Sequence, residues 1–110
     1  MTGAEEMLTA ADRLERLAAR STSGNWRTTG LLASRPEVVA HRPDGGTEHV
    51  AEARAASGAW IAALSPAVAR PLVALLRTAA ARPEADPDAL ALARVLLDRL
   101  PSPGAAPGVP

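Results

Sequence analysis

The turn PDGG (Pro43–Gly46) lies between EVVAH (37–41) and EHVAEA (48–53), and this stretch decides the fold class. Asp-Gly and Gly-Gly tolerate the positive φ that two- and three-residue hairpin loops require. The flanking segments contain β-branched residues and are bounded by glycine and proline, which is typical of short strands. With a further strand near residues 26–28, they predict a β-hairpin or meander in an otherwise helical chain, and hence an α+β domain.

Two strand registers of this hairpin are compatible with the sequence. If Asp44 and Gly45 form a two-residue loop, Val39 faces Val50 and His41 faces Glu48. If the loop has three residues, Arg42 faces Glu48 instead. The sequence does not choose between these two pairings.

The two histidines of the hairpin, His41 and His49, are the obvious metal candidates, and only the three-residue loop sets them face to face. A zinc site needs three or four converging ligands, and the chain has no cysteine to complete one. We therefore expect exposed strand histidines, no metal and no cofactor.

Helices are predicted on both sides of the strands. Residues 2–20 carry apolar side chains at three- and four-residue spacing, which indicates an amphipathic helix with Thr2 or Gly3 at its N-cap. Ser65-Pro66 and Asp86-Pro87 are helix-start signals, so further helices are expected at about 55–64, 66–81 and 87–100. The stripes facing the core consist of Met7, Leu8, Ala11, Leu14, Leu17 and Ala18 in the first helix, and of Leu90, Ala93, Leu96, Leu97 and Leu100 in the last.

Pro71 is the anomaly in the second half, because proline inside a helix removes a backbone hydrogen bond. It predicts a bend near residues 68–71. We expect this bend to let Trp60, Ile61 and Leu64 wrap one core together with three leucines of the next helix, Leu72, Leu75 and Leu76. Residues 1–100 then form a single domain, and the Pro/Gly/Ala-rich residues 101–110 form a disordered tail.

Composition excludes several classes of function. All 12 basic residues are arginine, which indicates a coding sequence rich in G and C, and 12 acidic residues balance them. The N-terminus lacks the apolar core of a secretory signal, and Pro66, Arg70, Pro71 and Arg77 interrupt the most apolar stretch, so we expect a cytoplasmic protein without a membrane span. No nucleophile elbow or phosphate-binding glycine loop occurs in the sequence, which predicts a protein that is not an enzyme.

Two kinds of partner surface are candidates. The alanines at 79–81 and 89–93 permit close helix approach, for self-association or a protein partner, or else they close the core within the chain. Tryptophan is enriched at binding hot spots, but we expect both tryptophans in the core, with Trp26 as the one also able to meet a partner. The alternative is a DNA-associated regulator, which is disfavoured by the balanced charge. Its candidate face consists of Arg70, Arg77, Arg82, Arg94 and Arg99 on the last two helices.

Two motifs resemble the Ead-like small proteins of phages and prophages. The family has a Thr-Pro-Gly-Pro-Trp turn, which here reads TSGNW (22–26) with both prolines replaced. The second motif, an aromatic-Ile-Ala-Ala segment before a proline-started helix and leucines, reads WIAALSP (60–66) followed by Leu72, Leu75 and Leu76. The resemblance covers about residues 8–76. It implies a phage-derived or prophage-like accessory protein, and similar proteins have no assigned catalytic residues.

Overall fold

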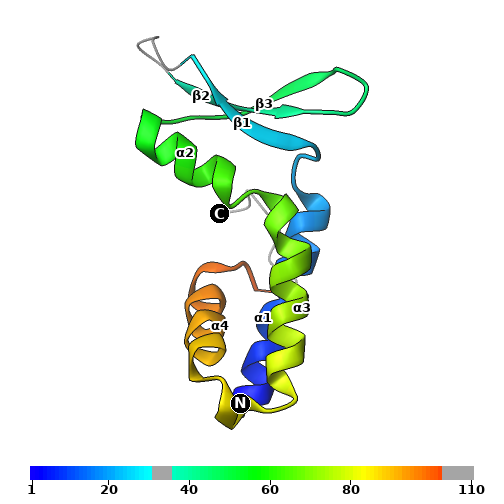
Figure 1. Ribbon diagram of the computed structural model, residues 1–110, viewed down its shortest axis with the longest axis vertical. Coiled ribbons are helices and arrows are strands. Elements are labelled where there is room, and N and C mark those ends of the chain that lie inside the picture. The colour runs from blue at the N-terminus through cyan, green and yellow to red at the C-terminus, as the bar shows by residue number, and fades with distance from the viewer. Residues whose placement is uncertain (31–35, 103–110) are drawn as a thin grey trace. The chain divides into compact units, whose positions relative to one another are not determined.

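The computed structural model describes residues 1–30 and 36–102 (Figure 1). Helices and strands occur at nearly the bounds expected from the sequence, and the chain is an α+β protein. The predicted tail lies outside the described residues except for 101 and 102. The elements in chain order are α1 (Gly3–Arg20), β1 (Asn25–Thr29), β2 (Glu37–His41), β3 (Thr47–Glu52), α2 (Ala55–Ala63), the 3-10 turn η1 (Pro66–Val68), α3 (Ala69–Ala80), the 3-10 turn η2 (Pro83–Ala85) and α4 (Pro87–Arg99).

The contacts among these elements divide the chain into two compact units. The first, which we call the helical unit, comprises Met1–Arg20 and Ala69–Pro110. The second, the sheet unit, comprises Ser21–Val68. Each unit has buried residues of its own.

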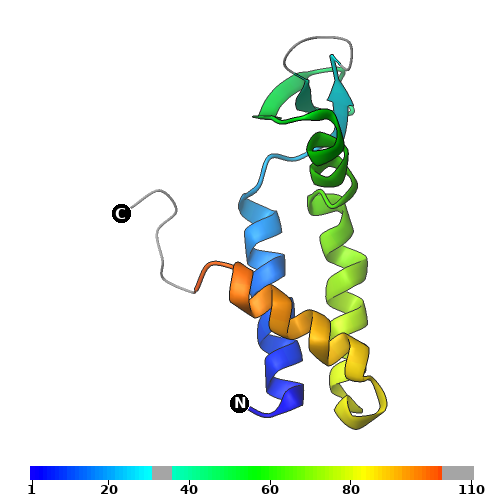
Figure 2. The same ribbon diagram turned by 90° about the vertical axis from the view of Figure 1, so that its left-hand side faces the viewer.

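In the helical unit, α1 packs against both α3 and α4, which touch each other much less. α4 crosses α1 obliquely (Figure 2). The buried cluster is built largely of alanine, with Met7 and Leu76 as its largest fully buried side chains. Leu14, Leu90, Leu92, Leu96 and Leu97 pack around it. The cluster consists of Met7, Ala10 and Ala11 of α1, Val73, Leu76, Ala79 and Ala80 of α3, and Ala89 and Ala93 of α4.

Burial in this unit differs from the prediction at some positions. Ala79, Ala80, Ala89 and Ala93 are buried against the helices of their own chain and close the core. Ala81 and Ala91 of the same two segments are exposed, so a partner surface there stays a prediction. Leu8, which was expected in the core stripe of α1, is 44% exposed. Its neighbour Met7 takes the buried position because adjacent residues on a helix point about 100° apart.

Side-chain caps fix the starts of two helices in this unit. The Oγ1 atom of Thr2 accepts a hydrogen bond from the Glu5 N–H (3.1 Å), and the Glu5 carboxylate accepts one from the Thr2 N–H (3.4 Å), so Thr2 rather than Gly3 is the N-cap. At α4, the Asp86 side chain accepts a hydrogen bond from the Ala89 N–H (3.0 Å), as predicted. Both caps satisfy backbone donors that the first helical turn leaves free.

The sheet unit is an antiparallel sheet in the order β1-β2-β3, and α2 packs on β1 and β2. α2 faces the sheet at Gly58, the residue of this helix that is buried. A Cβ atom at this position would lie 3.4 Å from the Thr28 side chain and 3.8 Å from that of Val38. The face of the sheet that carries Thr28 and Val38 is therefore the one that α2 covers.

The hairpin turn has three residues, but it begins one position earlier than either register assumed. Arg42 and Gly46 close the loop through a hydrogen bond from the Arg42 N–H to the Gly46 carbonyl oxygen (2.8 Å). The loop therefore consists of Pro43, Asp44 and Gly45. Gly45 has φ +87°, which the third residue of such a loop requires. Pro43 is the first residue of the loop, where the fixed φ of proline is favourable.

Both predicted pairings near the turn are consequently wrong. His41 lies opposite Thr47, and Ala40 lies opposite Glu48. The register then shifts by one residue between Val38 and Val39, so that Val50 is the extra residue of a β-bulge. A bulge changes the register partway along a hairpin, which a rule based on loop length alone does not anticipate.

One helical segment ends and the next begins close to the bend predicted at residues 68–71. η1 ends at Val68 and α3 begins at Ala69. The Val68 N–H donates to the Ser65 carbonyl oxygen (2.9 Å), which is the bond of a 3-10 turn. Pro71 thus lies in the first turn of α3, where a backbone N–H has no partner within the helix, so its missing donor is tolerated.

Candidate interaction surfaces

The guanidinium of Arg77, a predicted partner-binding residue, is engaged within the helical unit. It donates to Asp12 (2.9 Å) and to both carboxylate oxygens of Glu15 (3.2 Å each) on α1. The hydrogen bonds with Glu15, and then the one with Asp12, raise the pKa of Arg77 above its already high ordinary value. Arg77 therefore links α3 to α1 and remains charged at any physiological pH.

Arg94, also predicted to bind a partner, pairs with Glu6 of α1 at 2.8 Å. Arg99 pairs with its neighbour Asp98 at 3.2 Å. Arg70 and Arg82 are exposed and form no ion pair within residues 1–30 and 36–102. Acidic groups therefore neutralise three of the five arginines of the candidate DNA-binding face.

Trp26 is neither fully buried nor fully exposed, so partner binding by this residue stays a prediction. Its side chain is half-buried on the face of the sheet that α2 covers, and its Nε1–H donates to the Thr22 carbonyl oxygen (2.9 Å). It also lines an open pocket of about 510 Å³ at the edge of the sheet. Three alanines of α2, Ala59, Ala62 and Ala63, line the same pocket.

Trp60 is not a core residue, contrary to the expectation from the sequence. Its side chain is 69% exposed, and Leu64, one turn later, is 55% exposed. The physical reason is the burial of Gly58: consecutive residues of a helix are 100° apart, so Trp60 points about 200° away from the glycine that meets the sheet. Leu75 of α3, also expected in the core, is 52% exposed.

The outward face of α2 is uncharged and, apart from Ser57, apolar. No charged residue occurs from Ala55 to Ala69. We use the term α2 face for six exposed residues of this helix and its C-cap, namely Ala56, Ser57, Ala59, Trp60, Ala63 and Leu64. The sequence offered one signal for it, the single glycine within the helix, whose position marks the side that faces the sheet.

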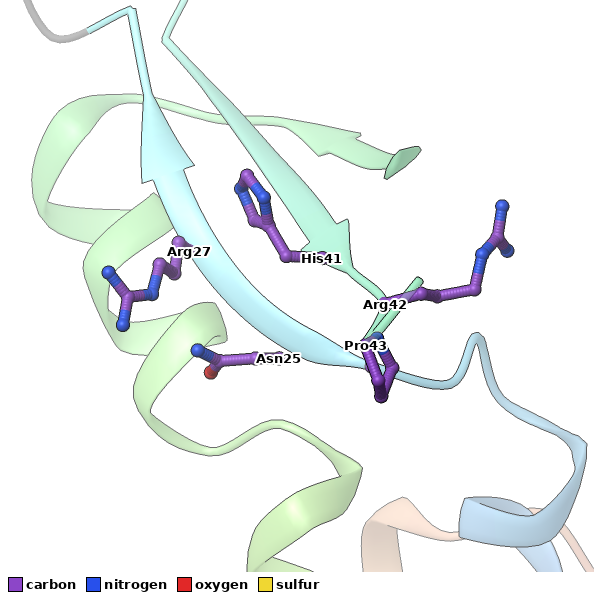
Figure 3. A pocket seen from close by; sticks show the side chains of 6 residues that line it. Asn25, Arg27, His41, Arg42 and Pro43 are labelled. Atoms are coloured by element: carbon purple, nitrogen blue, oxygen red, sulfur yellow. The ribbon is translucent and has the colours of Figure 1, made fainter. Parts of the chain in front are cut away.

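A second pocket, of about 550 Å³, lies at the end of the sheet near the hairpin turn (Figure 3). It is lined by Gly24, Asn25, Arg27, His41, Arg42 and Pro43, so that three basic side chains and no acidic one border it. The Arg42 side chain extends away from those of Asn25, Arg27 and His41 (Figure 3) and pairs with Glu48 at 3.2 Å. No motif in the sequence predicts this pocket, although the alternating polar residues of β1 indicate an exposed strand face.

The structure does not set the two histidines directly opposite each other. His49 lies opposite Val39 on the neighbouring strand, and its Nδ1 atom is 2.6 Å from the Glu37 carboxylate. Among residues 1–30 and 36–102, no group of three or more metal-ligating side chains converges.

By length and composition alone, one stretch of the described chain, Ala55–Ala80, is long and apolar enough to cross a membrane. An 18-residue window within it has a mean hydropathy of 1.6, and the full stretch includes Arg70 and Arg77. A single stretch of this kind is weak support for a membrane location. The cytoplasmic location therefore stays a prediction.

Comparison of the chain with protein-family models, curated proteins and solved structures finds no match. The resemblance to the Ead-like phage proteins accordingly stays a prediction that rests on the two short motifs.

Proposed function

We propose that this chain is a non-enzymatic, phage- or prophage-like accessory protein that acts by binding a second copy of itself or another protein. The observation that carries the proposal is the α2 face, where a tryptophan and a leucine are exposed on a helix without charge. Exposed apolar residues that cluster on one element are typical of interaction sites, whereas single exposed leucines are ordinary.

The size of the effect follows from the exposure of Trp60. A buried tryptophan removes about 150–250 Å² from water, so a side chain that is 69% exposed offers roughly 100–170 Å² to a partner. At about 25 cal/mol per Å², this area contributes roughly 2.5–4 kcal/mol to association. That contribution is within the range measured for binding hot spots.

Light scattering at micromolar concentration tests the self-association form of the proposal. We expect the wild-type protein to associate and Trp60→Ala to weaken the association by roughly 70- to 900-fold, the equivalent of 2.5–4 kcal/mol. Leu64→Ala should weaken it less. Leu75→Ala is the matched control. Leu75 is exposed to about the same extent as Leu64 but lies in the helical unit, so this substitution should leave the association unchanged.

If the wild-type protein is strictly monomeric, self-association is wrong and a different protein must bind. A photo-crosslinking residue at Ala56 or Ala63 of the α2 face, compared with one at Leu75, then locates the contact. Mass spectrometry should identify one partner that crosslinks from α2 and is lost in Trp60→Ala. Equal crosslinking from all three positions would refute the α2 face as the binding site.

The alternative function, a DNA-associated regulator, draws less support from the structure. Arg77 and Arg94, two members of its candidate face, already pair with acids of α1. This alternative predicts retention on heparin or DNA that falls steeply with added salt, and no retention at low salt would exclude it.

A further inference from the structure

The basic pocket of the sheet unit is centred on the strand face opposite α2, although Asn25 and Arg27 also line the pocket beside α2. Side chains alternate between the two faces of a strand, and Thr28 of β1 points toward Gly58 of α2. Asn25 and Arg27 therefore lie on the opposite face of β1. His41 of β2 is the direct cross-strand partner of Asn25, so it shares that face.

Gly24 lines this pocket at a point where two backbone segments lie close together. It has φ +112°, and a Cβ atom at this position would lie 2.8 Å from the His41 carbonyl oxygen, which is too close for any other residue. The glycine thus lets the chain before β1 approach the end of β2 closely, which places the side chains of Asn25 and His41 on neighbouring backbones.

The side chains that remain available in the pocket are hydrogen-bond donors. The Arg27 guanidinium forms no ion pair within the described part of the chain, and it supplies a fork of N–H groups with a permanent positive charge. The Asn25 amide and the His41 imidazole supply further N–H donors, the latter with a charge when protonated. Among the acidic residues of β2 and β3, Glu48 pairs with Arg42 and Glu37 with His49.

We propose that Asn25, Arg27 and His41 bind a phosphoryl group, either as free phosphate or as a phosphate ester. A carboxylate is planar and would be satisfied by the arginine alone, whereas a phosphoryl group presents three oxygens that can accept from three separate side chains. The pocket volume of about 550 Å³ lies in the range of small-molecule sites and leaves room for the rest of an ester. This proposal is independent of the α2 face.

Nuclear magnetic resonance of the ¹⁵N-labelled full chain tests the proposal, with inorganic phosphate as the probe and sodium chloride keeping the ionic strength constant. We expect shifts of the Asn25, Arg27 and His41 signals that saturate, with a dissociation constant on the order of millimolar. Arg27→Gln should weaken binding by about tenfold or more, because it removes the charged donor. Arg16→Gln, which removes an exposed arginine of α1, should leave binding unchanged.

The amide spectrum of Arg27→Gln shows directly whether the variant is folded, and Asn25→Ala provides a second variant that keeps the charge. Glycerol 3-phosphate in place of phosphate distinguishes the two sources: tighter binding indicates an ester, and weaker binding indicates the free anion. Shifts that stay linear in phosphate, that appear equally with chloride, or that persist in Arg27→Gln would each overturn the proposal.

Discussion

Replacing Leu76 with alanine is expected to destabilise the helical unit severely. Leu76 is fully buried, and it is one of only two large side chains that are completely enclosed in a cluster otherwise dominated by alanine. Leucine-to-alanine changes in cores cost about 2–5 kcal/mol, more where the surroundings cannot collapse. Alanine methyl groups have no rotamers with which to fill the space, so we expect the upper part of that range, about 3–5 kcal/mol. Since small domains have only about 5–15 kcal/mol of stability, this is a large fraction.

Leu75→Ala is the control for this prediction, because the two leucines are adjacent on α3 and Leu75 is 52% exposed. Half of its transfer free energy is about 1 kcal/mol, and the higher helix propensity of alanine offsets part of it. Urea unfolding followed by circular dichroism at 222 nm measures both variants, and the m-value shows whether the native state stays compact. Equal losses for the two variants would refute the assignment of Leu76 to the core.

Three further substitutions test the local structure, each by thermal or urea unfolding. Gly58→Leu should destabilise the sheet unit by about 1–3 kcal/mol through overpacking against the sheet, whereas Gly58→Ala should be close to neutral because its Cβ fits at 3.4 Å and its helix propensity is higher; a tolerated leucine would contradict the packing of α2. Asp86→Ala should cost about 1 kcal/mol through loss of the cap of α4, and Asp86→Asn should retain most of it. Arg77→Gln should lower the melting temperature more than Arg70→Gln on the same helix, and the difference should shrink in 1 M salt; an equal effect would mean that the pairs with α1 contribute nothing.

The positions of helices and strands could be predicted because their signals are local. A capping residue followed by proline marks the start of α4, and turn residues bound each strand. These signals depend on a few neighbouring residues whose backbone preferences the rest of the fold does not override. The restart of the helix before Pro71 belongs to the same group, because proline constrains the chain wherever it occurs.

The hairpin register depends on more than the turn. Asp44-Gly45 and Gly45-Gly46 are both acceptable loop centres, and the structure uses neither as a two-residue loop because Pro43 is favoured at the first position of a type I turn. The bulge at Val50 then returns Val38 and Ala51 to the pairing that a two-residue loop would have given. Packing of the buried Val38 side chain selects the pairing of Val38 with Ala51. No local pattern in the sequence of β3 predicts this pairing.

The prediction that Trp60 of α2 is buried is wrong, and the reason is physical. A helix that is apolar all round has no polar side to mark solvent, so its hydrophobic pattern does not say which residues are buried. Size suggested that Trp60 belongs to the core. Close packing against a sheet instead selected the smallest residue, Gly58, and turned the largest one outward.

The two proposed binding surfaces differ in chemistry, although Asn25 and Arg27 also line the pocket that Ala59 and Ala63 of α2 border. α2 covers the face that carries Thr28 and Val38, and strand alternation puts Arg27 and His41 on the other face. One surface is apolar and insensitive to salt, whereas the other is basic and depends on charge. Raising the salt concentration should therefore weaken anion binding while leaving association through Trp60 intact, so each surface can be studied in a protein that keeps the other.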